Sequence, residues 1–234
     1  MPAPVGVKEA ARHLGVAASR VRALIASGGL RADKVGGRWL VDWDSVLARE
    51  RAQAAPGRPF TAHNAWALLL LASGDEFPPD RDRQAQWRLR GTLRRHRLVD
   101  LESRLDRRAV VHHLWALPGE LRRLRDASDL ALTGSSAAGA LGLELLAPET
   151  VDAYVQDSGL SVLMSENGLE PVPPRDANVI LRAVPDDAWL LAGRRVAPRA
   201  AVAFDLAGYP DSRSARAGLE LLDALDAGRY GEDS

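Results

Sequence analysis

The chain of 234 residues contains no cysteine, which excludes disulfide bonds and thiolate metal sites. Long apolar runs are also missing. The longest one, Ala65 to Ala72, is far shorter than the ~20 residues that a membrane-spanning helix requires. No secretory signal is recognisable at the N-terminus. With an apolar fraction of 46%, the composition predicts a folded cytoplasmic protein without a membrane segment.

The chain also lacks net charge, but its charges are unevenly distributed. Residues 1–125 contain 23 Lys and Arg against 13 Asp and Glu, whereas residues 126–234 contain 8 against 18. A basic N-terminal half is typical of nucleic-acid binding. Phosphates would repel the acidic half, so we expect it to face away from DNA, to pair with another subunit or to bind a protein partner.

The first fifty residues carry the clearest structural pattern. Apolar residues at helical spacing predict two short helices that pack across a turn at Gly15-Val16. Two strands, Arg31 to Val35 and Arg38 to Val41, are joined by Gly36-Gly37, a dipeptide suited to the positive φ angles of a two-residue hairpin. Together these elements predict a winged helix-turn-helix, with the hairpin as its wing.

The second helix of this motif predicts a surface that contacts double-stranded DNA. Its apolar positions turn inward, so Arg20 and Arg22 remain outside near the helix start, where they can contact guanine edges or phosphates. Lys34 and Arg38 flank the hairpin turn, where side chains meet phosphates or the minor groove. The alternative is that these residues are solvated surface of a small helical domain. The predicted contact residues are Ser19, Arg20, Arg22, Ala23, Arg31, Lys34 and Arg38.

This segment resembles the MerR and excisionase-type helix-turn-helix family. The matching pieces are the Glu-Ala-Ala from Glu9, the Leu-Gly-Val from Leu14, the Val-Arg at Val21 and the Gly-Gly-Arg-Trp from Gly36. The family usually places Ser or Thr straight after Leu-Gly-Val as a helix N-cap. Here that residue is Ala17, so the cap comes from elsewhere or is absent at a cost of ~1 kcal/mol. The resemblance implies a DNA-binding domain over residues 1–55.

A helical, arginine-rich middle region is predicted over residues 60–126. Asp42 is expected to cap the preceding helix, Trp43 to Ala54, and a linker follows. Within the middle region, Thr61 is expected to cap an apolar helix that ends at Ser73. The segment 109–115 fits either a strand or a helix, and Pro118 suits the first position of a further helix.

The most basic segment of this region is a helix that starts at Asp80 or Asp82 and runs to Arg97. Arg88, Arg94 and Arg95 are the residues that we expect to contact DNA there. The alternative is that these arginines form a solvated face or pair with acidic residues of the C-terminal half.

Residues 127–228 alternate strand-like and helix-like segments and predict a C-terminal mixed α/β domain, so the fold class of the chain is α+β. Ser212 is expected to cap the last helix. The predicted strands are 130–132, 151–155 and 178–184, and the predicted helices are 135–143, 198–206 and 212–226.

Part of this region is similar to the nucleotidyltransferase layout. There a Gly-Ser pair, here Gly134-Ser135, grips phosphates, and a later strand holds magnesium with two alternate carboxylates. In this chain Asp152 is followed at the second position by Tyr154, and a phenol is a poor magnesium ligand. We therefore expect a degenerate nucleotidyltransferase-like fold, not an enzyme, with no cofactor. The adjacent pair His112-His113 is also a poor metal chelate, because neighbouring side chains diverge.

Residues 104–226 resemble the AbiEi-type antitoxins of type IV toxin-antitoxin systems. The resemblance implies a winged N-terminal domain and autoregulation at inverted repeats of the protein's own operon. The matching segments are Leu132 to Ala138 with Leu141-Gly142, Val151 to Val155, Val179 to Arg182, and Val196 to Pro198 through Phe204 to Leu206 and Leu222.

These observations predict a sequence-specific transcriptional regulator, a repressor that acts as a homodimer because one helix-turn-helix contacts only a half-site. It would be an antitoxin-like autoregulator that is cytoplasmic and associated with the nucleoid. One alternative is an excisionase-like architectural protein that assists recombination. A less favoured alternative is a divergent nucleotidyltransferase.

Overall fold

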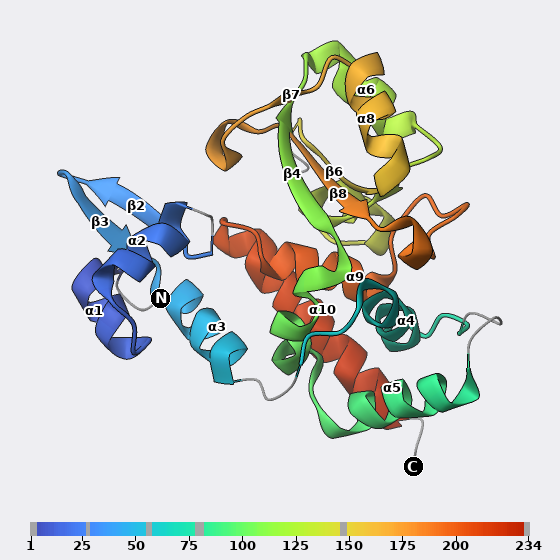
Figure 1. The fold of residues 1–234 in the computed structure, drawn as a ribbon, viewed down its shortest axis with the longest axis horizontal. Helices are drawn as coiled ribbons and strands as arrows, with labels where there is room; N and C mark the ends of the chain where they lie inside the picture. The colour runs from blue at the N-terminus through green and yellow to red at the C-terminus, as the bar shows by residue number, and fades with distance from the viewer. Residues whose placement is uncertain (1–3, 27–28, 55–57, 78–81, 146–148, 232–234) are drawn as a thin grey trace. The chain divides into compact units, whose positions relative to one another are not determined.

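The computed structural model of the chain describes residues 4–26, 29–54, 58–77, 82–145 and 149–231 (Figure 1). It divides into two units, residues 1–57 and 58–234. The regions 60–126 and 127–228, which the sequence analysis treats separately, both lie in the second unit. Among the described residues, no helix is both long enough and apolar enough to cross a bilayer.

In its described residues, the first unit has three helices and a small antiparallel sheet. The strands lie in the order β1-β3-β2, and Val5 of β1 pairs with Val41 of β3. The sequence analysis predicted β2 and β3 but not the two-residue β1. The elements are α1 (Val7–His13), α2 (Ala18–Ala26), α3 (Trp43–Ala54), β1 (Val5–Gly6), β2 (Ala32–Val35) and β3 (Arg38–Val41).

The predicted helix-turn-helix packing is present in this unit. Ala10 and Ala11 of α1 are buried with Val21 and Leu24 of α2 in a single apolar core. Gly15 ends α1 with a φ of +64°, a backbone conformation that glycine adopts without a steric penalty. Local spacing therefore suffices to specify this pair of helices.

The β2–β3 hairpin has the predicted turn. Gly36 and Gly37 have φ angles of +54° and +78°, as a two-residue turn of this kind requires at both central positions. Val35 and Arg38 pair on either side of the turn. The two glycines thus set the register that places Lys34 opposite Trp39.

The second unit contains a five-stranded sheet in the order β5-β6-β8-β4-β7. Only β6 and β8 pair in parallel among its described strands. The segment that fitted strand or helix is strand β4. The strands are β4 (Val110–Trp115), β5 (Ala131–Leu132), β6 (Val151–Gln156), β7 (Glu170–Pro171) and β8 (Val179–Val184).

Seven helices are described in the second unit. They are α4 (Ala62–Ala72), α5 (Arg83–Arg95), α6 (Pro118–Asp126), α7 (Gly134–Ala137), α8 (Asp157–Glu166), α9 (Arg199–Ala207) and α10 (Ser212–Gly231). Short 3-10 segments are Leu98–Arg104, Asp106–Arg108, Gly139–Leu141, Pro174–Asp176 and Asp186–Ala188.

Two apolar cores lie on the two faces of the five-stranded sheet, because alternate side chains of a strand point to opposite faces. On one face, Val151 and Ala153 of β6 pack with Leu124 of α6 and Leu163 of α8. On the other, Tyr154 joins residues of α4, α5, α9 and α10 in the larger core. Figure 1 shows α6 and α8 together on one side of the sheet and α9 and α4 on the other.

Several helix starts agree with the sequence analysis and one does not. Thr61 caps α4 by accepting a hydrogen bond from the amide of Asn64, and Asp82, one of the two expected starts, caps α5. Ser212 is instead the first residue of α10, and Asp211 accepts a hydrogen bond from the Ser214 amide at 2.8 Å. The aspartate reaches the free amide of the first turn, which a residue inside the helix does not.

Two further helices differ from expectation. The helix expected over 135–143 is shorter: α7 ends at Ala137, and Gly142 then adopts a left-handed φ of +70°. Helix α8 was not predicted from the sequence. Its apolar pattern is interrupted by Gly159 and Ser161, so its helical period is weak in the sequence.

Candidate nucleic-acid interface

The solvent face of α2 displays the residues that were predicted to contact DNA. Val21 and Leu24 are buried, and Ser19, Arg20, Arg22 and Ala23 are exposed. Neither arginine forms an ion pair with another described residue. The two guanidinium groups are therefore available for an external anion.

The hairpin adds two more exposed cationic side chains, Lys34 and Arg38. The Lys34 Nζ lies 5.9 Å from the ring centroid of Trp39, its cross-strand partner, at the outer limit of a cation–π contact. Within the described part of the chain, neither Lys34 nor Arg38 pairs with a carboxylate. Both sides of the turn thus carry a positive charge.

Arg31 is used inside the domain. Its Nε and Nη2 atoms lie 3.2 and 3.3 Å from the two carboxylate oxygens of Asp42, and the Arg31 side chain is mostly buried. Asp42 also accepts a hydrogen bond from the Ser45 amide, so it caps α3 as predicted. The ion pair fastens the segment before β2 to the start of α3.

The start of α2 lacks a side-chain cap at Ala17. The backbone amides of Arg20 and Val21 donate to the Ala17 carbonyl at 2.9 and 3.2 Å, so Ala17 occupies the N-cap position. A methyl group cannot accept hydrogen bonds from the amides of the first turn. Ala17 therefore supplies no side-chain cap to the helix that carries Arg20 and Arg22.

The remaining predicted contact residues, Arg88, Arg94 and Arg95, lie on α5 of the second unit. All three are exposed. A different arginine, Arg97, pairs with an acidic residue of the C-terminal half: its Nη2 lies 2.7 Å from Asp223.

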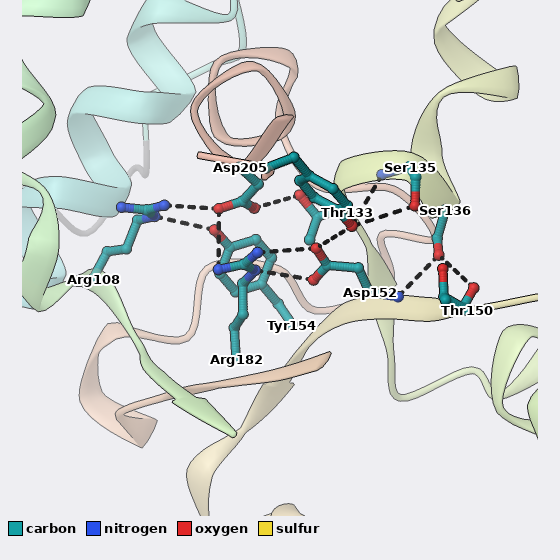
Figure 2. A network of polar contacts seen from close by, with 10 residues as sticks. Arg108, Thr133, Ser135, Ser136, Thr150, Asp152, Tyr154, Arg182 and Asp205 are labelled. Atoms are coloured by element: carbon teal, nitrogen blue, oxygen red, sulfur yellow. Dashed lines mark hydrogen bonds and ion pairs between the residues drawn. The ribbon is translucent and has the colours of Figure 1, made fainter. Parts of the chain in front are cut away.

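A second constellation lies buried in the second unit and was not anticipated from the sequence (Figure 2). Arg182 of β8 makes a two-point contact with Asp152 of β6, at 3.0 and 2.9 Å. Its Nη1 lies 3.5 Å from Asp205 of α9, and Arg108 contacts the same carboxylate at 2.7 Å. Two guanidinium groups thus balance two buried carboxylates.

Hydroxyl groups complete this network. Tyr209 donates to Asp152 at 2.8 Å, Thr133 donates to Asp205 at 2.5 Å, and Arg108 donates to the Tyr154 hydroxyl at 3.1 Å. The positive φ of Gly134, +51°, brings its backbone against this cluster: a Cβ there would lie 2.6 Å from an Asp152 oxygen. The segment Thr133-Gly134-Ser135 is therefore part of the network, because it donates a hydroxyl hydrogen bond to Asp205 and packs its backbone against Asp152.

The two carboxylates differ in acidity. Burial alone would raise the pKa of Asp205, but the guanidinium groups of Arg182 and Arg108 outweigh it and lower that pKa. Burial raises the pKa of Asp152, and Arg182 offsets only part of that effect. Asp205 is therefore the more firmly ionised centre of the network.

The sequence contained one signal for this network: single charged residues inside apolar segments. Arg182 interrupts the buried strand β8, and Asp205 interrupts the buried helix α9. A charge is seldom buried without a partner, so each one predicts a partner without identifying it.

A comparison with known families supports the first unit's architecture. A family model described as a helix-turn-helix domain matches residues 5–53, from the start of β1 to nearly the end of α3. The chain is similar to that family over this segment and has an N-terminal helix-turn-helix domain, a class typical of DNA-binding regulators. In comparisons with curated proteins and with solved structures, nothing matched the chain.

Proposed function

We propose that this protein is a sequence-specific DNA-binding transcriptional repressor that contacts the major groove with α2. The observation that carries the proposal is the exposed face of α2, where Arg20 and Arg22 lack carboxylate partners among the described residues. The match of residues 5–53 to a helix-turn-helix family supports it. The finer resemblance to MerR and excisionase-type domains is part of the same proposal.

The chemistry of the contacts follows from the side chains. Arg20 and Arg22 are placed to donate paired hydrogen bonds to guanine O6 and N7 or to phosphates. Lys34 and Arg38 act as the tips of a wing that neutralises phosphates and so displaces bound counterions. Arg31 has a positioning role, because its charge is already held by Asp42.

Repression requires a complete operator. A single helix-turn-helix contacts only one half-site, so we propose that a homodimer binds an inverted repeat. Occupation of that repeat in the protein's own promoter would block transcription of its own operon.

Fluorescence anisotropy with labelled duplexes from the upstream region tests this proposal. The wild type should bind one upstream duplex at least tenfold more tightly than a random duplex, with an affinity that falls steeply as salt rises. The double variant Arg20→Ala/Arg38→Ala should lose that preference. A matched control is Arg216→Ala, which removes an exposed arginine that pairs with Glu220. Full operator preference in the double variant would overturn the assignment.

An architectural, excisionase-like role makes a different prediction. Such a protein bends DNA at clustered sites, whereas a repressor needs only one inverted repeat. Gel mobility of circularly permuted fragments distinguishes the two. Mobility that does not depend on the position of the site supports the repressor.

For the second unit we propose a non-catalytic, antitoxin-like role in binding a protein partner. The contact of Arg182 with both Asp152 and Asp205 supports this, because a guanidinium already occupies the place where a metal would need carboxylate oxygens. Magnesium-dependent label transfer from any of the four nucleotides, abolished by Asp152→Ala, would instead establish an enzyme. The antitoxin role also predicts that the product of a neighbouring toxin gene copurifies with this chain.

A further inference from the structure

Helix α5 of the second unit presents an unusual solvent face. Arg83, Trp87, Arg90 and Arg94 are spaced by four, three and four residues, which aligns them along one side of the helix. All four are exposed, and 68% of the Trp87 surface is open to solvent. At 1.5 Å per residue the row is about 16 Å long. Figure 1 shows α5 at the edge of its unit.

The opposite face of α5 is committed to the fold. Leu89 and Leu93 are buried in the larger core of the second unit with Trp66 of α4 and Leu98. Thr92 donates to the Arg88 carbonyl within the helix and is buried as well. The orientation of α5 is therefore fixed, and the arginine row points outward.

The arginines of this row have no internal counter-charge. Neither these three nor Arg88 and Arg95 beside them form an ion pair with any residue that the structure describes. Some other exposed arginines of the unit are paired, such as Arg123 with Glu120 at 2.9 Å and Arg216 with Glu220 at 2.8 Å. So much unbalanced positive charge on one short helix points to an external polyanion.

We propose that α5 is a second DNA-binding surface, which holds phosphates of the duplex backbone. The inference rests on the proposed function of the first unit. The arginines of the row would bind phosphates through paired N–H donors, and Trp87 would pack its ring against sugars or exposed base edges. The partner of α5 is the duplex that α2 also binds.

The composition of α5 favours DNA over an anionic membrane. A membrane-surface helix inserts an apolar face into the lipid, but the apolar face of α5 is buried in the protein core. Trp87 is the one apolar side chain on the outer row. A row with a single apolar side chain offers little surface for insertion into lipid.

Two linked binding surfaces reinforce each other. Because both surfaces belong to one chain, a duplex bound by α2 is held at a raised effective concentration for α5. Each phosphate contact adds about 0.9 to the slope of log affinity against log salt. Loss of three arginines should therefore lower that slope by about 2.7 and reduce affinity for every duplex alike.

The test is salt-dependent binding of the full chain to the operator duplex and to a random duplex of equal length. The triple variant Arg83→Gln/Arg90→Gln/Arg94→Gln should lose at least tenfold in affinity for both duplexes and keep the ratio between them. The same positions changed to Lys should restore most of the salt slope, because the positive charges return. Trp87→Ala should weaken binding to both duplexes by a similar, smaller factor, because contacts with sugars do not depend on the base sequence.

The matched control is Arg123→Gln/Arg175→Gln/Arg216→Gln, which removes the same charge from exposed arginines that pair with carboxylates. An unchanged salt slope in the α5 variant, or an equal loss in the control, overturns the inference. The inference also fails if the α5 variant keeps its DNA binding and instead loses binding to vesicles of anionic lipid or loses dimerisation. If the wild type shows no operator preference, the proposed function fails. Binding of the α5 variant to the random duplex then still tests the role of α5 independently.

Discussion

At the scale of single residues, Gly218 sets the contact between the last two helices. A Cβ at this position would lie 2.3 Å from the Ala207 nitrogen and 2.6 Å from the Ala203 oxygen, both backbone atoms of α9. Backbone atoms cannot move aside as a flexible side chain can. The absence of a side chain at Gly218 therefore allows α10 to approach α9.

Gly218→Ala should accordingly destabilise the protein, because α10 must shift away from α9. Overpacking of this kind costs about 1–3 kcal/mol or more, and here we expect at least about 2 kcal/mol. The measurement is chemical denaturation monitored by circular dichroism. Gly228→Ala in the same helix is the matched control, since a Cβ there meets nothing within 4 Å. It should be neutral or stabilising by up to about 1 kcal/mol.

A second residue-scale effect concerns pH. Burial and the nearby Arg182 guanidinium lower the pKa of His113, which shares the Arg182 face of the sheet. The unfolded chain therefore takes up a proton at His113 before the folded chain does. Stability should be at its full value above pH ~6.5, the ordinary histidine value, and should fall as the pH is lowered through the folded-state pKa.

Denaturation midpoints between pH 5 and 7.5 check this expectation. His113→Gln should flatten the slope below pH ~6.5. His112→Gln is the comparison, because the side chain of His112 points to the opposite face of β4. An undiminished slope in the His113 variant would rule out this histidine as its source.

At the scale of secondary-structure elements, α2 offers a direct test of helix capping. Ala17 occupies the N-cap position and cannot accept a hydrogen bond through its side chain. Ala17→Ser should therefore stabilise the protein by about 1 kcal/mol, the usual contribution of a hydroxyl cap. Ala26→Ser, at the other end of the same helix, should give no gain. Equal effects of the two substitutions in thermal denaturation would show that α2 is not limited by its cap.

The same scale shows what the sequence could and could not predict. Spacing and caps within about fifteen residues determine α2, the Gly36-Gly37 hairpin and the start of α4 at Thr61, and these predictions are confirmed. β1 was missed because two residues form a strand only when β3 lies beside them. The interrupted apolar pattern of α8 is equally uninformative without the sheet face that it covers.

At the scale of the whole molecule, the buried polar network joins segments that are far apart in the chain. Arg108 and Asp205, and likewise Asp152 and Arg182, meet only after the sheet and α9 have assembled. No local pattern states which buried charge pairs with which. In the sequence, Asp152 stood out only through its similarity to a degenerate nucleotidyltransferase pattern, and Arg182 could not be identified as its partner.

The segregated charge belongs to this scale as well. The surplus of basic residues in the N-terminal half includes both α2 and the outer row of α5. The two surfaces thus lie in different units, and both carry positive charge. A chain with both surfaces should show a steeper salt dependence of DNA binding than its helix-turn-helix contacts alone supply.

The network also predicts how the second unit responds to loss of a buried charge. Asp205→Asn leaves Arg108 and Arg182 with one anionic partner fewer inside the protein, and breaking a buried ion pair in this way costs about 3–5 kcal/mol. Because the pKa of Asp205 is lowered in the folded state, its contribution to stability should be complete above the ordinary aspartate value of ~3.9 and should disappear as the pH falls through the folded-state pKa.

Chemical denaturation at pH 7 measures the loss of stability in Asp205→Asn. Asp223→Asn, which breaks the exposed pair with Arg97, is the matched control and should change stability by less than about 1 kcal/mol. Equal small losses in the two variants would contradict this prediction, because they would show that Asp205 is no more important than an exposed partner.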